Sequence, residues 1–187
     1  DMRIAIEKDY NSWISSGSAI AVKKEQVPAG AQVLWSRVVL TLKDIVERGV
    51  ATGQTKCKAR IVVLGFEDER AVVDGLATDA PTVTRVGGRV AAQIALSRGW
   101  THYSGDVSTA FLRGDTLEKS VFAFIPKIVG AATGMVLKIV KGVFGLLDAP
   151  RLWYQGITKD LVALGARQCP LDPCVFLWFE EGGESQQ

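Results

Sequence analysis

The sequence contains very little histidine and cysteine, which limits the chemistry that it can support. Its single histidine, His102, would have to serve any catalytic triad, and nothing in the sequence points to one. The three cysteines are an odd number, which argues against a disulfide scaffold. Cys169 and Cys174 lack the further ligands that a structural zinc ion needs. We therefore expect a reducing, intracellular setting.

Long apolar runs and a strong net charge are also missing. No run of about 18 apolar residues could cross a bilayer and no segment resembles a signal peptide, so we expect no membrane partner. The formal net charge of +2 is too small to indicate nucleic-acid binding, so a basic surface would have to be local. Phosphate-binding loops of the Walker and Gly-x-Gly-x-x-Gly types do not occur.

The composition nevertheless suits a globular domain. With 48% hydrophobic and 22% charged residues, the 187-residue chain can fill a core. The chain starts at Asp1 and ends in the polar residues 180–187, and we interpret it as part of a longer protein.

Apolar periodicity and turn residues predict an α+β fold with much antiparallel pairing. Helical periodicity predicts helices over residues 3–15, 82–98 and 150–164. β-branched and aromatic residues predict strands over 33–40, 57–66, 100–103, 120–125, 135–140 and 174–179. The first two strands are expected to form a hairpin whose long tip contains Gly49 and Gly53. The expected inward residues of the first two helices are Ile4, Tyr10, Trp13, Ile14, Val86, Val90, Ile94 and Leu96.

Three short runs carry most of the functional information. Residues 58–66 read Lys-Ala-Arg-Ile-Val-Val-Leu-Gly-Phe, residues 104–112 read Ser-Gly-Asp-Val-Ser-Thr-Ala-Phe-Leu, and residues 143–154 begin Val-Phe-Gly-Leu-Leu-Asp-Ala-Pro-Arg. In the second run, Asp106 is predicted at the end of a strand, where the chain turns into a helix. Taken alone, an aspartate in this position is more often a helix cap or a solvated charge than a catalytic group.

The other residues of these runs also have ordinary explanations. Phe111 suits a core, and Lys58 and Arg60 suit the solvated face of a strand. Phe144 and Gly145 suit a tight turn before the helix that follows. In this order and at these distances, however, the three runs resemble the reverse transcriptases of Ty1/copia-type retrotransposons. Residues 78–82 and 171–176 match the same pattern, so the resemblance covers roughly residues 33–179.

The resemblance implies the fingers and N-terminal palm of a right-hand polymerase, with a largely antiparallel sheet and packed helices. Its implied parts are a helical lead-in over 1–30, the fingers and partial palm over 31–179, and a polar tail over 180–187. The implied partners are an RNA or DNA template-primer, deoxynucleotides and the rest of an element polyprotein, with integrase upstream and RNase H downstream. The implied location is a cytoplasmic particle, the nucleus or both.

The resemblance also assigns roles to particular residues. Asp106 and the backbone carbonyl of Val107 would bind Mg²⁺, because this ion prefers oxygen ligands. Phe111 would lie under the nucleotide sugar and leave no room for a 2′-hydroxyl group. Lys58 and Arg60 would approach the triphosphate, and strand register decides which of the two faces it.

The remaining implied roles belong to the third run. Phe144 and Gly145 would line the nucleotide pocket, where glycine lets the backbone approach the base or template closely. Arg151 would contact the template-primer. Leu147 and Asp148 depart from the Lys-Gln pair usual in the family, and an acidic group there would repel a template phosphate. Leu34 likewise replaces a lysine that is common in the family.

A second part of the expected metal site is missing. The polymerase mechanism needs two more carboxylates from a Tyr-x-Asp-Asp hairpin, and the sequence contains no adjacent pair of aspartates. We therefore expect this chain not to polymerise by itself. Without that hairpin the last strand would expose Val175, Phe176 and Trp178, which favours self-association. Two alternatives stay open, a non-enzymatic remnant of a decayed retroelement and an unrelated α+β domain that matches the motifs by chance.

Overall fold

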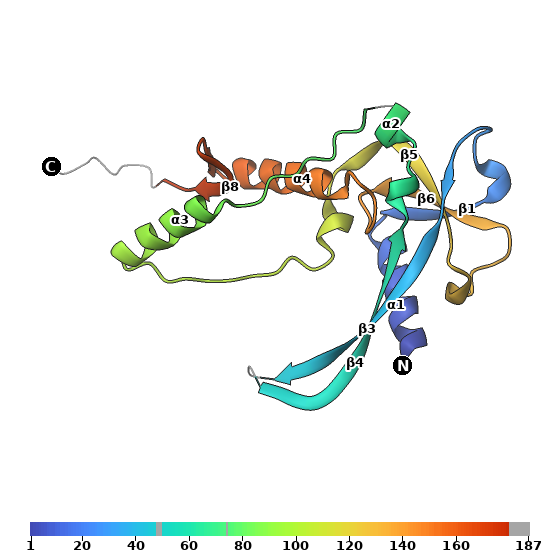
Figure 1. The fold of residues 1–187 in the computed structure, drawn as a ribbon, viewed down its shortest axis with the longest axis horizontal. Helices are drawn as coiled ribbons and strands as arrows, with labels where there is room; N and C mark the ends of the chain where they lie inside the picture. Colours follow the sequence, from blue (N-terminus) through green and yellow to red (C-terminus); the bar gives the residue numbers. More distant parts are fainter. Residues whose placement is uncertain (48–49, 74, 180–187) are drawn as a thin grey trace.

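The computed structural model describes residues 1–47, 50–73 and 75–179, so the polar tail and Gly49 lie outside the described residues. A four-stranded sheet with the order β1-β6-β5-β2 forms the centre of the molecule (Figure 1). The pairs β1–β6 and β6–β5 are antiparallel and the pair β2–β5 is parallel. The strands span Ala19–Lys23 (β1), Val33–Leu34 (β2), Thr116–Phe124 (β5) and Met135–Lys141 (β6). The expectation of a mixed α+β fold rich in antiparallel pairing is confirmed.

A long hairpin projects from this centre, as Figure 1 shows. It consists of β3 (Ser36–Glu47) and β4 (Val50–Val63), which pair antiparallel with a register shift between Asp44 and Val46. Strand β4 is longer than predicted, because the polar segment with Gly53 continues it instead of forming a connection. The predicted strand over 33–40 is divided between β2 of the central sheet and β3 of the hairpin. The predicted end of the second strand at Phe66 is wrong, since Gly65–Glu67 form a 3-10 turn (η2).

Helix α1 (Met2–Ser15) covers β4 and β1 and confirms the predicted first helix. Asp1 caps it by accepting a hydrogen bond from the Arg3 N–H at 2.9 Å. Trp13 is fully buried and Tyr10 is half-buried, as expected. The prediction for Ile4 and Ile14 is wrong, because the buried stripe of α1 runs through Ile6, Tyr10 and Trp13 and leaves those two side chains exposed.

The core lies between α1, the central sheet and the base of the hairpin. It gathers apolar side chains from every layer, which explains why the hairpin and the sheet are held together. Its buried members are Trp13, Ala19, Leu34, Ile61, Val63, Leu112, Val121, Ala123, Leu137, Ile139, Val143, Leu146 and Ala149.

A second group of elements lies away from the central sheet, toward the end of the described chain (Figure 1). It contains α3 (Arg85–Ser97), α4 (Ala149–Ala163) and the antiparallel hairpin of β7 (Arg167–Cys169) and β8 (Asp172–Leu177). Pro150 lies in the first turn of α4, as predicted. No helix among the described residues is long and apolar enough to cross a membrane.

Helix α3 turns its small residues, rather than its large apolar ones, toward β8. Gly87 lies against the Asp172 carboxylate and Ala95 is buried, whereas Val90 is 51% exposed. The inward prediction is therefore wrong for the whole apolar stripe, because the close approach of β8 requires residues without bulk at the contact. The exposed members of that stripe are Val86, Val90, Ile94 and Leu96.

The predicted strand over 100–103 is also wrong. Residues 100–107 form no helix or strand, and Trp100 and Tyr103 are largely exposed. An isolated strand is not stable without a neighbour, and none of the described strands pairs with this segment. The predicted short helix follows as the 3-10 turn η3 (Ala110–Arg113). Other short turns are η1 (Lys24–Gln26), α2 (Arg70–Val73) and η4 (Lys127–Val129).

Candidate functional site

Strand β4 separates a basic face from a buried face. Ala59, Ile61 and Val63 point into the core and are at most 5% exposed. Lys58 and Arg60 alternate with them and therefore share the opposite face. The sequence left open which of the two cations would face the triphosphate. Both lie on the same side of the strand, so the register does not distinguish between them.

Three predicted nucleotide-contacting residues meet beside β4. The guanidinium carbon of Arg60 lies 5.0 Å from the centroid of the Phe144 ring. Phe144 in turn meets Phe111 edge-to-face, with 5.3 Å between ring centroids and 69° between ring planes. Both distances are within the range of favourable cation–π and aromatic contacts. Arg60, Phe144 and Phe111 come from β4, the turn after β6 and η3, so the fold joins three separate segments of the chain.

Gly145 follows Phe144 where the turn presses onto β4. Its φ is +97°, a left-handed value that favours glycine, and a Cβ here would overlap the Val63 carbonyl oxygen. The Val63 N–H donates to the Phe144 carbonyl oxygen at 2.9 Å, and Gly65 makes an equally close approach to the Gly145 carbonyl. The protein's own backbone therefore requires this glycine.

Asp106 lies in the irregular segment between α3 and η3, and its side chain is exposed. Its carboxylate is close enough to Lys58 to act on the charge of that ammonium group. Burial, together with the positive charges of Arg60 and Lys43, lowers the pKa of Lys58, and the negative charges of Asp106 and Asp9 partly oppose this. Asp106 thus lies at the basic face of β4, while the side chain of Val107 is half-exposed.

The described residues do not provide a complete metal site. Nowhere in residues 1–47, 50–73 and 75–179 do three histidine, cysteine or acidic side chains gather to hold an ion. One carboxylate cannot hold Mg²⁺ by itself, because this ion requires an ordered set of oxygen ligands. The acidic partners that Asp106 would need are therefore not found in this part of the chain.

Asp9 belongs to the same region and was missed by the sequence analysis. Its Oδ2 accepts a hydrogen bond from the Ile61 N–H at 2.7 Å. Burial raises the pKa of Asp9, while the Ile61 hydrogen bond and the charges of Arg60 and Lys58 oppose the rise. A half-buried aspartate in a helical pattern leaves no signal in a single sequence, because the pattern does not say which strand the helix will cover.

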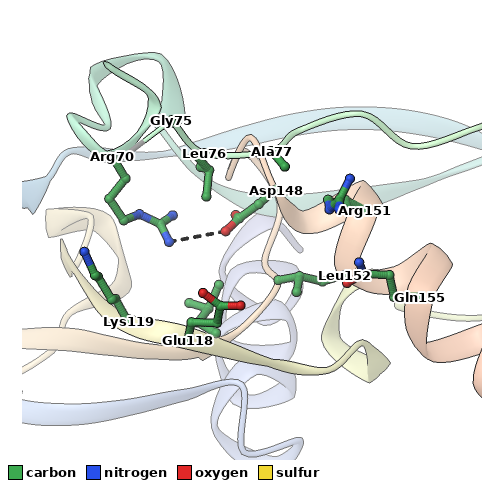
Figure 2. A pocket seen from close by; sticks show the side chains of 11 residues that line it. Arg70, Gly75, Leu76, Ala77, Glu118, Lys119, Asp148, Arg151, Leu152 and Gln155 are labelled. Carbon is green, nitrogen blue, oxygen red and sulfur yellow. Dashed lines mark hydrogen bonds and ion pairs between the residues drawn. The ribbon is translucent and has the colours of Figure 1, made fainter. Parts of the chain in front are cut away.

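Arg151 lies apart from Arg60 and Phe144, and it lines the cavity shown in Figure 2. Its Nη1 forms an ion pair with the Asp79 carboxylate at 3.0 Å, and Asp79 is 86% exposed. Arg70 lies in the same cavity, of about 400 Å³, together with Glu118 and Lys119 of β5. The structure therefore does not bring Arg151 together with Arg60 and Phe144.

Asp148 faces Arg70 in the same cavity (Figure 2). It is 5% exposed, and its Oδ2 pairs with Arg70 Nη1 at 3.2 Å, while Asp68 binds the same guanidinium at 2.6 Å. Burial lowers the pKa of Arg70, but the hydrogen bonds and charges of Asp68 and Asp148 outweigh it, so the net pKa is raised. Asp148 is thus paired within the chain, where Arg70 shares its single positive charge between Asp148 and Asp68.

The chain is an α+β protein. The side chains gathered beside β4 are of types that can contact a nucleotide, namely the aromatic rings of Phe111 and Phe144, the guanidinium of Arg60 and the ammonium group of Lys58. The family model described as "Reverse transcriptase (RNA-dependent DNA polymerase)" matches residues 24–184. The chain therefore belongs to the reverse transcriptase family. No solved structure matches it significantly.

Three curated relatives are Pol polyproteins of plant retrotransposons. The chain is 30% identical over 177 residues to the retrovirus-related Pol polyprotein from transposon TNT 1-94 of Nicotiana tabacum. It is 31% and 28% identical to those from transposons RE1 and RE2 of Arabidopsis thaliana, over 64% of its length. The chain spans 12% of the first relative and 8% of the other two. These matches support a copia-type retrotransposon reverse transcriptase fragment.

Proposed function

We propose that the chain supplies the fingers and N-terminal palm of an RNA-dependent DNA polymerase within a larger Pol polyprotein. The fingers and partial palm would comprise residues 31–179, after a helical lead-in over 1–30 and before a polar tail over 180–187. The observation that carries the proposal is the meeting of Arg60, Phe144 and Phe111. Residues that the family resemblance assigns to one nucleotide come from three distant segments, and they lie in contact.

In this proposal the incoming deoxynucleotide binds against the basic face of β4. Arg60 and Lys58 bind the triphosphate, since a guanidinium and an ammonium group both suit phosphate oxygens. Phe111 lies under the sugar and excludes a 2′-hydroxyl group. Phe144 supports both neighbours, because its ring contacts both the Arg60 guanidinium and the Phe111 ring. Gly145 keeps this turn close to β4.

Asp106 and the Val107 carbonyl are proposed as ligands of a divalent metal, taken to be Mg²⁺, in the intact polymerase. When bound, the metal would neutralise phosphate charge and activate the primer hydroxyl. The described residues do not complete such a site, so this chain by itself is proposed not to polymerise. Arg151 is proposed to contact the template-primer in the same intact protein.

The first experiment separates nucleotide binding from catalysis. The 187-residue chain is titrated with dATP and with ATP while Arg60 and aromatic resonances are followed by NMR. We expect both sets to move, and dATP to bind more tightly than ATP because of Phe111. Binding without a shift of the Arg60 resonances, or no binding at millimolar dATP, would contradict the proposed site.

Primer extension with Mg²⁺ should give no product, and templated incorporation would contradict the proposed inactivity.

The second candidate function is a non-enzymatic remnant of a retroelement that binds nucleic acid weakly or not at all. The buried positions of Leu34 and Asp148, where the family usually has lysine and glutamine, favour it, because both are integrated into the packing of the chain. The coding sequence after the Gln187 codon distinguishes the two. An open frame with an apolar strand and two adjacent aspartates favours the polymerase, whereas an early stop favours the remnant.

The wider partners are proposals on the same basis. The relatives are Pol polyproteins, so other element domains, integrase before this region and the rest of the palm and RNase H after it, are proposed as covalent partners. An RNA or DNA template-primer is the proposed substrate. A cytoplasmic particle or the nucleus is the proposed location.

A further inference from the structure

Strand β4 has one edge that none of the described strands covers. Its other edge pairs with β3 along nearly the whole hairpin. On the open edge, the Ile61 N–H donates to Asp9 Oδ2 at 2.7 Å and the Val63 N–H donates to the Phe144 carbonyl oxygen at 2.9 Å. Alternate N–H groups of a strand point to the same side, so these two hydrogen bonds form a short row along that edge.

The two acceptors come from different parts of the site. Phe144 lies in the turn after β6, where its ring contacts Phe111, whereas Asp9 belongs to α1. Arg60 lies between Ile61 and the rest of the hairpin, and it is the residue whose guanidinium stacks over Phe144. The row of hydrogen bonds therefore fixes the stretch of β4 from which Arg60 projects.

Asp9 is not required simply to hold α1 in place. Trp13 and Ile6 already anchor that helix, because both are almost fully buried. A half-buried carboxylate is costly unless its hydrogen bonds are satisfied, and burial does raise the pKa of Asp9. An apolar residue at this position would leave the buried Ile61 N–H without an acceptor. The placement of Asp9 thus points to a polar task at the strand edge.

The other charged residues around Asp9 are cationic. It lines a cavity of about 580 Å³ between α1, the hairpin and residues 108–109, and among the described lining residues it is the one acid. The cations that line this cavity are Lys8, Lys43, Lys56 and Lys58. Arg60 and Lys58 are close enough to act on the charge of Asp9. Its carboxylate therefore also offsets the mutual repulsion of the cations on β4.

We propose that Asp9 is a positioning residue, which holds the open edge of β4 so that Arg60 stays over Phe144 and Lys58 stays beside Asp106. The positional part of this inference stands on the hydrogen bonds alone. Its consequence for nucleotide binding rests on the function proposed above. Without Asp9, β4 keeps the Phe144 hydrogen bond at Val63 but can twist about it, and Arg60 moves away from the ring.

Two substitutions and one control test this role in the 187-residue chain. Asp9→Leu removes the acceptor but keeps a side chain that branches at Cγ, whereas Asp9→Asn keeps an acceptor oxygen and removes the charge. Glu7→Gln is the matched control, because Glu7 is an exposed acid on the same helix. Each variant is checked by NMR for the Ile61 amide and the Arg60 side chain, and is then titrated with dATP.

In the unmodified chain, the Ile61 amide proton should shift as the pH passes through the pKa of Asp9, with a midpoint above that of an ordinary aspartate. The other charged groups that face Asp9 are the cations Lys8, Lys43, Lys56, Lys58 and Arg60. This titration should disappear in both Asp9 variants and persist in Glu7→Gln. An Ile61 amide that does not respond to pH would overturn the proposal.

The binding results separate positioning from general stability. We expect Asp9→Leu to shift the Arg60 resonances away from the Phe144 ring-current position and to weaken dATP binding about tenfold. Asp9→Asn should retain the Arg60 position and bind dATP at least as tightly as the unmodified chain, since a negative charge is removed. If folded Asp9→Leu keeps both the Arg60 position and the dATP affinity, the proposal is wrong. If Asp9→Leu does not fold, loss of the Arg60 position in folded Asp9→Asn overturns it instead.

The same experiment distinguishes this proposal from the proposed function. If the unmodified chain does not bind dATP, the nucleotide site fails, and the Ile61 and Arg60 resonances still decide whether Asp9 positions β4. If dATP binds and neither resonance depends on Asp9, the nucleotide site stands and the positioning role is overturned.

Discussion

The guanidinium carbon of Arg60 lies 5.0 Å from the centroid of the Phe144 ring, although one residue is on β4 and the other follows β6. The Val63 N–H bond to the Phe144 carbonyl brings the two segments together. Phe111 then completes the cluster from η3. The exposed guanidinium of Arg60 therefore lies over the Phe144 ring. Asp106 lies close to Lys58, the other cation on this face of β4.

Replacing Arg60 should weaken nucleotide binding according to the geometry that is lost. Arg60→Lys keeps the charge but loses the planar group that stacks on Phe144, so we expect dATP binding to weaken about fivefold to tenfold. Arg60→Ala should weaken it more, because the charge is lost as well. Titration followed by NMR or calorimetry measures both. Arg89→Ala, on exposed α3, is the control, and an equal effect of Arg89→Ala would indicate nonspecific charge attraction.

The sequence predicted the elements whose neighbours are close in the chain. The hairpin of β3 and β4, the strands β5 and β6, and the start of α4 at Pro150 all follow from local composition and turn residues. The segment 100–103 has the composition of a strand but remains irregular, because a strand also needs a partner and composition cannot show whether one is present.

The candidate site was predicted only in part. The family pattern named Arg60, Phe144 and Phe111, but not that Phe144 would touch the other two. Asp9 and Arg70 were missed because their partners are distant in sequence, and a single sequence does not show which distant groups pair. Asp148 departs from the family pattern and forms an unpredicted ion pair with Arg70, so such a residue can have a partner elsewhere in the chain.

Gly145→Ala should destabilise the chain strongly. The residue has φ of +97° and a Cβ would overlap the Val63 carbonyl, so we expect a loss of about 3 kcal/mol in the free energy of unfolding. Urea unfolding followed by circular dichroism measures it. Gly88→Ala is the matched control, because Gly88 is in α3 with 3.9 Å to the nearest atom, and it should gain about 0.5–1 kcal/mol. Equal stability of the two variants would show that the turn can relax away from β4.

Arg70→Met should be costly because it leaves two buried carboxylates without a cation. Asp68 and Asp148 are at most 5% exposed, and removing one partner of a buried ion pair typically costs about 3–5 kcal/mol. Arg151→Met is the comparison, since its partner Asp79 is 86% exposed and the expected loss is below about 1 kcal/mol. Urea unfolding gives both values. Similar losses in the two variants would mean that Asp68 and Asp148 become hydrated or protonated without Arg70.

The exposed stripe on α3 should promote self-association. Val90 and Ile94 are 51% and 43% exposed. Trp178, which directly follows β8, is 56% exposed. We expect the sedimentation coefficient to rise with protein concentration, and Val90→Gln/Ile94→Gln to reduce that rise. Ile128→Gln, which changes an exposed apolar residue of η4, is the control. A monomer at all concentrations would contradict the expectation of self-association.

Acid should loosen α3 from β8 through Asp172. This carboxylate accepts hydrogen bonds from the Cys174 N–H and from the Thr84 hydroxyl and N–H, at 3.0, 2.8 and 2.9 Å. These bonds lower the pKa of Asp172 below its ordinary value. Because the pKa is lower in the folded state, the stabilisation is complete above the ordinary aspartate pKa of about 3.9 and is lost as the pH falls through the folded value.

The Thr84 and Cys174 amide resonances should therefore shift together, with a midpoint at a pH below the ordinary pKa of aspartate. The helical signal of α3 should decrease in the same pH range. Asp172→Asn should remove this pH dependence and leave α3 less firmly held at neutral pH, because an amide is a weaker acceptor than a carboxylate. Asp160→Asn, at an exposed position on α4, should leave the transition unchanged. If the two amides titrate at the pH of an ordinary aspartate, Asp172 does not hold α3, because the hydrogen bonds to Thr84 would then contribute nothing to the contact.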